Sequence, residues 1–190
     1  MRGLHASFAL LAAASLLLGG SPSASSFRLH SLSFSNATRI SREFLCRALG
    51  GENRSPELHW SDPPPGTKSF ALVVHDPDAP VPGGWWHWGI YDIPASVRGI
   101  PAGGHVPGRQ AIGSSHRQQY DGPCSPPGKV HHYHFTLYAL DRATLGGDAP
   151  LTAKHLAHLA AAHAIARARL TGLFSVPAAM RPKAPVRSSP

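Results

Sequence analysis

The fold is decided by residues 132–140, which read His-Tyr-His-Phe-Thr-Leu-Tyr-Ala-Leu. Successive side chains of a strand point to opposite faces of its sheet. The odd-numbered positions 133 to 139 are aromatic or aliphatic, whereas the even-numbered positions 134 to 138 carry polar atoms. This alternation predicts a strand with one buried face and one more polar face.

Other apolar segments on both sides of this stretch are too short for helices and rich in strand-forming residues. We predict strands at 69–75, 88–93 and 57–60, and a weakly extended segment at 27–34 that opens the mature fold. Residues 99–128 are rich in glycine and irregular, and a loop of that length is usually functional or disordered.

One alanine-rich segment has the spacing of an amphipathic helix. We predict this helix from Thr152, its N-cap, to Arg169, with a last strand over Ala168–Phe174. Strands and proline-rich turns dominate the rest, so the sequence predicts a mainly β, antiparallel domain with one packed C-terminal helix.

The two ends of the chain differ in composition from the middle. Residues 1–25 combine a basic start, a short apolar run and small residues, the layout of a secretory signal peptide rather than a membrane span. We therefore expect a domain over 26–175, a disordered proline-rich tail over 176–190, and a periplasmic or secreted protein that is not integral to the membrane.

The chain has two cysteines, Cys46 and Cys124. In an exported protein they permit one disulfide that closes a long loop, and the alternative is two separate buried thiols. The formal net charge is +8, but no basic run or nucleic-acid motif occurs, so we expect anionic ligands rather than nucleic acid.

Two proline-stiffened blocks carry the candidate site: Asp76-Pro-Asp-Ala-Pro80 followed by Trp85-Trp-His-Trp88, and Asp121-Gly-Pro-Cys through to His131-His-Tyr133. If strands 69–75 and 88–93 pair, Asp76 can reach His87 and orient its imidazole. His131 and Tyr133 share one face of the next strand, and Gly122 offers an unhindered amide. Such donors suit a phosphate or carboxylate group.

Tryptophans 85, 86 and 88 are predicted to wall this cavity, and Asp78 either joins it or caps its own turn. Two aspartates and two histidines also match a metal's ligand set, although no helical His pair or Cys-x-x-Cys motif is present. A serine hydrolase is weaker, because no Gly-x-Ser-x-Gly elbow surrounds Ser125.

These motifs, in this order, resemble the phosphatidylethanolamine-binding protein family, and more closely its bacterial, Raf-kinase-inhibitor-like branch. The resemblance covers about residues 27 to 175. Further matching pieces are Asn53-Arg-Ser-Pro-Glu-Leu-His-Trp60, Pro65-Gly-Thr-Lys-Ser-Phe-Ala-Leu-Val-Val74, Gly122-Pro-Cys-Ser-Pro-Pro127, Phe135-Thr-Leu-Tyr-Ala-Leu-Asp141 and Ala168-Arg-Leu-Thr-Gly172.

The resemblance implies a sandwich-like β fold with a small pocket for phosphate-like head groups. Carried over by motif, the pocket residues are Asp76, Asp78, His87, Gly122, His131 and Tyr133. Several members of the family act by binding and inhibiting kinases or proteases, and bacterial members are often dimers. Where the family commonly has His-Arg-Tyr, this chain has His131-His132-Tyr133, which replaces a permanent cation with a titratable one.

The sequence therefore predicts a non-enzymatic exported protein without a cofactor, whose pocket holds a small anion and which regulates or inhibits a protein partner. Ligand binding is assigned to Asp76, Asp78, Trp85, His87 and Gly122, together with His131 and Tyr133. The alternatives are a metal-assisted hydrolase and an inhibitor acting by surface contact. With His87 and His131 as donors, anions should bind more tightly below about pH 6.5.

Overall fold

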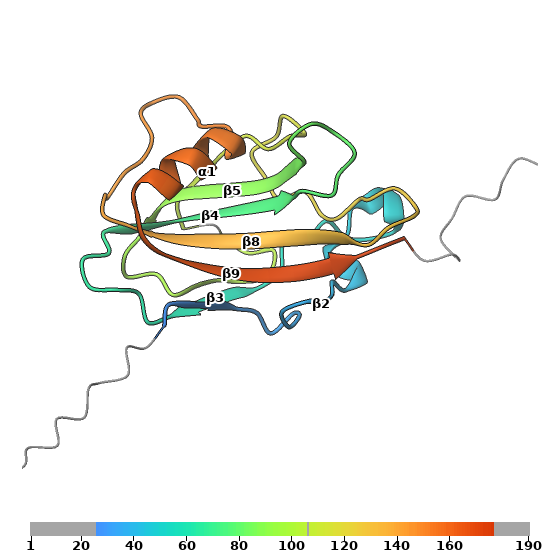
Figure 1. The fold of residues 1–190 in the computed structure, drawn as a ribbon, viewed down its shortest axis with the longest axis horizontal. Coiled ribbons are helices and arrows are strands. Elements are labelled where there is room, and N and C mark those ends of the chain that lie inside the picture. The colour runs from blue at the N-terminus through green and yellow to red at the C-terminus, as the bar shows by residue number, and fades with distance from the viewer. Residues whose placement is uncertain (1–25, 106, 177–190) are drawn as a thin grey trace, which may run out of the picture.

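The computed structural model describes residues 26–105 and 107–176 (Figure 1). The predicted signal peptide and all but the first residue of the predicted tail lie outside the described residues. That first residue, Val176, is buried in the core rather than part of a tail.

Within the described residues the strands form two sheets, and one α-helix packs against the larger of them. The larger sheet is six-stranded and has, in spatial order, β2 (Thr38–Arg39), β9 (Ala164–Phe174), β8 (His131–Leu140), β4 (Ser69–Asp76), β5 (Trp85–Pro94) and β7 (Arg109–Gln110). The smaller sheet is three-stranded and has β1 (Arg28–His30), β3 (Leu58–Ser61) and β6 (Gly99–Ile100). All pairings are antiparallel except that of β2 with β9.

The main core lies between the two sheets. The odd-numbered side chains of β8 point into it, as the alternation predicted, and meet Phe70 and Leu72 of β4 and Trp60 of β3. The predicted mainly β architecture is confirmed. Two short 3₁₀ helices, Arg42–Phe44 and Arg47–Leu49, lie in the segment before β3.

The helix α1 (Ala153–Ala162) covers the opposite face of the large sheet over β4 and β5 (Figure 1). Thr152 caps it as predicted, accepting a hydrogen bond from the amide of His155. At Gly89 of β5 an added Cβ would lie 2.9 Å from Ala111 and 3.1 Å from Leu156, so this glycine permits the close approach of the helix.

The predicted extent of the helix is wrong, because the chain enters β9 at Ala164 instead of continuing to Arg169. From Ala166 onward the pattern has a period of two: Ala168 and Leu170 are buried, while Arg167 and Arg169 are exposed. Pairing with β8 along the whole length of β9 outweighs the helix propensity of alanine.

The predicted strands are present with shifted ends. The strand expected at 88–93 begins three residues earlier, at Trp85, and this difference matters for the site. The region 99–128, expected to be irregular, contributes β6 and β7 but is otherwise loop.

Candidate functional site

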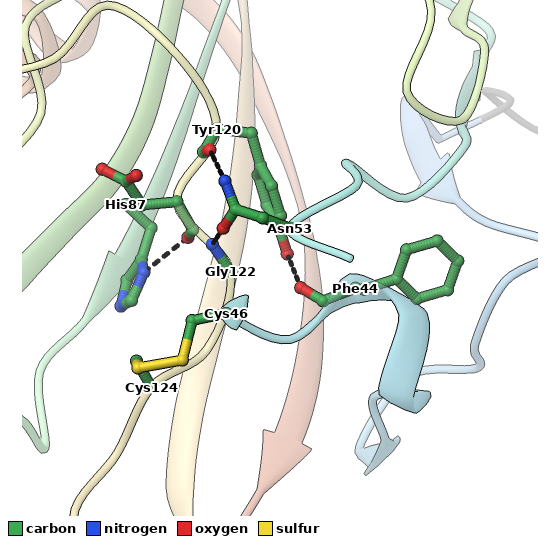
Figure 2. Close-up of a disulfide and its surroundings, with 8 residues drawn as sticks. Phe44, Cys46, Asn53, His87, Tyr120, Gly122 and Cys124 are labelled. Atoms are coloured by element: carbon green, nitrogen blue, oxygen red, sulfur yellow. Dashed lines mark hydrogen bonds between the residues drawn. A yellow bond between two sulfur atoms is a disulfide. The ribbon is translucent and has the colours of Figure 1, made fainter. Parts of the chain in front are cut away.

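The candidate site lies where the C-terminal end of β4 meets the N-terminal ends of β5 and β8. These three strands are neighbours in the sheet, so Asp76, Trp85 and His131 come to the same edge from distant parts of the sequence. The loop 121–126 and the segment around Cys46 close the site from the side (Figure 2).

A β-bulge directs His87 into the site. The register of β4 with β5 pairs Val74 with Trp88 but His75 with Trp86, which leaves His87 as an extra residue. Simple alternation would place Trp86 and Trp88 on one face and His87 on the other. The bulge instead puts His87 and Trp88 on the cavity side, while Trp86 stacks on His75 with ring centroids 4.1 Å apart.

The sequence suggested that Asp76 orients His87. In the structure Asp76 instead forms a buried pair with His131. Its Oδ2 accepts a hydrogen bond from His131 Nδ1 at 2.7 Å, and its Oδ1 accepts one from the amide of Asp78 at 2.8 Å. Asp76 is 2% exposed and His131 1%. Both carboxylate oxygens are therefore already engaged inside the protein.

His87 makes its hydrogen bond to the backbone instead of to a carboxylate. Its Nδ1 donates to the carbonyl oxygen of Asp121 at 2.8 Å (Figure 2). Burial lowers the pKa of His87 to about 4, even though the Asp121 carbonyl and the charge of Asp76 act in the other direction. With this pKa the His87 ring is neutral near pH 7, and tighter anion binding below about pH 6.5 stays a prediction.

Gly122 has a structural role that the sequence did not reveal. Its amide, expected to face a ligand, donates to Asn53 Oδ1 at 2.7 Å, and Asn53 Nδ2 donates to the carbonyl of Tyr120 at 3.0 Å (Figure 2). A Cβ at position 122 would lie 2.3 Å from the carbonyl oxygen of Phe44. Glycine is needed here because two backbones cross at close contact.

The structure joins Cys46 and Cys124 in a disulfide at this crossing (Figure 2). The amide of Cys46 also donates to the carbonyl of Pro123 at 3.1 Å. The covalent bond and the backbone hydrogen bond fix the 121–126 loop beside the 3₁₀ helices. Both cysteines line the cavity.

The cavity is open to solvent on one side and has a volume of about 990 Å³. Of the residues predicted for the site, Asp76, Trp85, His87, Gly122, His131 and Tyr133 line it. Trp88 lines it as well, whereas Trp86, also expected in the wall, does not.

Asp78 is the predicted site residue that the structure places elsewhere, because it is absent from the cavity lining. Its Oδ2 accepts hydrogen bonds from the amide and the Nδ1 of His132, at 2.9 and 2.7 Å. Lys129 Nζ lies 3.6 Å from its Oδ1. The hydrogen bond from the His132 side chain contributes most to lowering the pKa of Asp78.

Three polar atoms on buried cavity-lining residues have no hydrogen-bond partner of regular geometry: His87 Nε2, Ser125 Oγ and Tyr133 Oη. Burial raises the pKa of Tyr133, so its hydroxyl keeps its proton. Buried polar groups normally find partners, so these three atoms are candidates for hydrogen bonds to a ligand or to water.

Sequence reasoning missed three arginines of the lining. Arg54 is paired with Glu43 at 3.1 Å, which leaves Arg47 and Arg117. Arg47 follows the disulfide cysteine, and Arg117 follows a turn closed by the hydrogen bond from the Gly113 amide to its carbonyl. Both side chains are exposed and have no hydrogen bond or ion pair within the described part of the chain. Nothing in their local sequence marks them, because only the folded chain brings them to one cavity.

Among residues 26–105 and 107–176, no group of three or more His, Cys, Asp or Glu side chains is placed to hold a metal ion. In the same ranges no helix is both long and apolar enough to cross a bilayer.

This architecture defines a class: a β-sandwich with a helix on one outer face and a polar cavity at the end of its central strands. Comparison with known proteins gives the family. The profile of the phosphatidylethanolamine-binding protein family matches residues 30–175, and the chain belongs to that family.

Its relatives include bacterial proteins of the UPF0098 group. YbcL of Escherichia coli is 35% identical over 170 residues, which cover 82% of this chain and 91% of YbcL. YbhB of the same organism is 37% identical over 135 residues, 66% of this chain and 84% of YbhB. The crystal structure of YbcL, described as a new member of the mammalian PEBP family, aligns with a TM-score of 0.75 and 32% identity over 80% of this chain and all of that one.

A third relative is the putative lipoprotein LppC of Mycobacterium tuberculosis. It is 40% identical over 156 residues, which cover 80% of this chain and 74% of LppC.

Proposed function

We propose that this chain is a non-enzymatic, exported binding protein whose cavity holds a small phosphate-type anion. One observation carries the proposal: a single cavity combines the guanidinium groups of Arg47 and Arg117 at its rim with the buried hydroxyls of Ser125 and Tyr133 on its wall. These hydroxyls lie close enough to interact with each other, but neither makes a hydrogen bond of regular geometry. The name of the family, phosphatidylethanolamine-binding protein, supports a phosphate-bearing ligand.

The two kinds of donor suit different parts of an oxyanion. Guanidinium groups match the geometry of phosphate oxygens and stay charged at every physiological pH. The buried hydroxyls add directional hydrogen bonds without burying another charge. The anion's charge is therefore balanced mainly by the rim arginines, because His87 is neutral near pH 7.

Export is supported by the disulfide between Cys46 and Cys124, since structural disulfides persist in oxidising compartments. The similarity to a putative lipoprotein agrees with a location outside the cytoplasm. We also keep the proposal from the sequence that this protein regulates or inhibits a protein partner.

The metal-assisted hydrolase receives no support from the geometry. The Asp76 carboxylate pairs with His131 and the Asp78 carboxylate with His132, so these groups do not converge on a common point. Metal analysis of the purified full-length chain separates the two functions, because a hydrolase of this kind would contain stoichiometric metal.

Titration calorimetry with inorganic phosphate and with phosphorylethanolamine tests the anion site. The double variant Arg47→Ser/Arg117→Ser should weaken phosphate binding at least about tenfold, as expected for the loss of two charge-assisted contacts. The matched control is Arg167→Ser, on the outer face of β9 and absent from the cavity lining. Absence of binding heat with both ligands would refute the proposal.

A further inference from the structure

His87, on the inner wall of the cavity, presents a hydrogen-bond acceptor at its Nε2 atom. A carbonyl oxygen can only accept, so the 2.8 Å contact between His87 Nδ1 and the Asp121 carbonyl requires the hydrogen on Nδ1. In a neutral imidazole the other nitrogen, Nε2, then carries a lone pair. This Nε2 is buried and has no partner.

The tautomer is fixed by the backbone crossing next to the disulfide. Asn53 bonds the residues on both sides of Asp121, through the Tyr120 carbonyl and the Gly122 amide (Figure 2). The Asp121 carbonyl shares its peptide plane with the Gly122 amide, so it cannot turn away without breaking the hydrogen bond from that amide to Asn53. Asn53 itself has a positive φ of 56°, a conformation that asparagine tolerates better than most residues.

The groups around His87 leave its ring neutral at physiological pH. The carboxylate of Asp76 is bonded to His131 and to the Asp78 amide, and that of Asp121 accepts from Ser115 and Gln119. The ring of Tyr133 meets His87 edge-on, and the charge of His75 acts against protonation. Burial dominates and lowers the pKa of His87 to about 4.

We propose that the cavity selects an oxyanion that carries its own proton, such as hydrogen phosphate or the singly protonated form of a phosphate monoester, because a P–OH group can donate to the lone pair on His87 Nε2. This inference rests on the proposed anion-binding function and narrows its ligand class. The proton stays on the ligand oxygen throughout. The remaining phosphate oxygens accept from the hydroxyls of Ser125 and Tyr133 and from the rim arginines.

A fully ionised oxyanion meets a mismatch at the same place. Sulfate, or the phosphodiester of an intact lipid, has no hydroxyl and would set an oxygen lone pair against the Nε2 lone pair. It binds only if His87 takes up a proton from solvent, which burial opposes. A ligand that cannot donate to a buried acceptor leaves that acceptor unpaired. The resulting loss of affinity is larger than a difference in ligand size would cause.

Titration calorimetry at about pH 8 with inorganic phosphate and with sulfate measures how much the ligand's own proton contributes to binding. Phosphate is then almost entirely HPO₄²⁻, which matches sulfate in charge and shape and differs by one hydrogen. The rim arginines cannot distinguish the two dianions, so phosphate should bind at least about tenfold more tightly. Equal affinity would overturn the proton requirement while leaving the anion site in place. If neither anion binds, the proposed function fails and this inference fails with it.

Two further measurements test the role of His87 Nε2 as the acceptor of the ligand's proton. ¹⁵N NMR of the wild-type chain at about pH 8 should show His87 protonated only at Nδ1, both free and with phosphate; a hydrogen on Nε2 in the free protein would overturn the inference. The variant His87→Phe removes the acceptor and should bring the phosphate and sulfate affinities together. The control His134→Gln, on the outer face of β8 and bonded to Thr171, should keep the preference.

Discussion

Two aspartate–histidine pairs, close together in sequence, lie in opposite environments. Asp76 with His131 and Asp78 with His132 have the same Oδ2–Nδ1 distance of 2.7 Å. The first pair is almost fully buried at the cavity, whereas the side chain of His132 is 49% exposed. Consecutive residues of β8 thus supply one histidine to the interior and one to solvent.

The difference shows that the contribution of such a pair depends on solvent more than on geometry. Water screens the outer pair and competes for its hydrogen bonds. At the inner pair, removal of one partner leaves a buried polar group unsatisfied, which costs far more than the pair contributes on the surface. Substitutions at the two sites should therefore have very different effects.

The largest effect is expected for Asp76→Ala. It removes the acceptor for both His131 Nδ1 and the Asp78 amide, and no water-filled surface replaces it. The free energy of unfolding should fall by about 3 to 5 kcal/mol, measured by urea denaturation at neutral pH. A loss below about 1 kcal/mol, the range of surface pairs, would show that the buried pair is not the stronger of the two.

A buried histidine without a carboxylate partner should give a pH signature. The folded-state pKa of His87, about 4, lies below the unfolded value of 6.5, so the unfolded chain binds more protons between these values. Stability is fully present above about pH 6.5, falls as the pH drops toward 4, and the loss attributable to His87 reaches about 3 kcal/mol.

The measurement is the difference in unfolding free energy between wild type and His87→Phe as a function of pH. This difference should shrink across the window as the wild type loses its advantage. A difference that stays constant from pH 7 to about 4 would mean that burial does not control the ionisation of His87.

The backbone crossing that fixes the Asp121 carbonyl can be tested with a glycine pair. Gly122→Ala places a Cβ 2.3 Å from the Phe44 carbonyl oxygen and 2.8 Å from the Cys46 amide nitrogen, backbone atoms that cannot yield cheaply. We expect a loss of about 2 kcal/mol or more in thermal or urea unfolding. At Gly147 an added Cβ meets nothing within 4 Å, so Gly147→Ala should be nearly neutral and serves as the control.

The smallest effect is expected at the outer pair. Asp78→Ala removes the partner of His132 and of Lys129, but both side chains can bond to water. The free energy of unfolding should change by about 0.5 kcal/mol, and this change should shrink further in high salt. If Asp78→Ala destabilises the protein as much as Asp76→Ala, the contrast between the two pairs disappears.

Much of the cavity could be predicted from sequence because proline and aromatic motifs mark the strand ends. The wrong predictions were those that depend on the register between neighbouring strands. The Trp85–Trp88 segment suggested a common tryptophan wall, but the bulge at His87 turns Trp86 to the outer face. Likewise, alanine-rich sequence after Ala162 favoured a continued helix until pairing with β8 decided otherwise.

The strands, the buried face of β8 and the family can be read from the amino-acid sequence, because alternation and motif order are local properties of the chain. The fold was needed to show that Asp76 bonds His131, that Asn53 holds the loop behind His87, and that Arg47 and Arg117 share one cavity. These features depend on contacts between segments far apart in the sequence. They also depend on how much water each group loses, which no local pattern records.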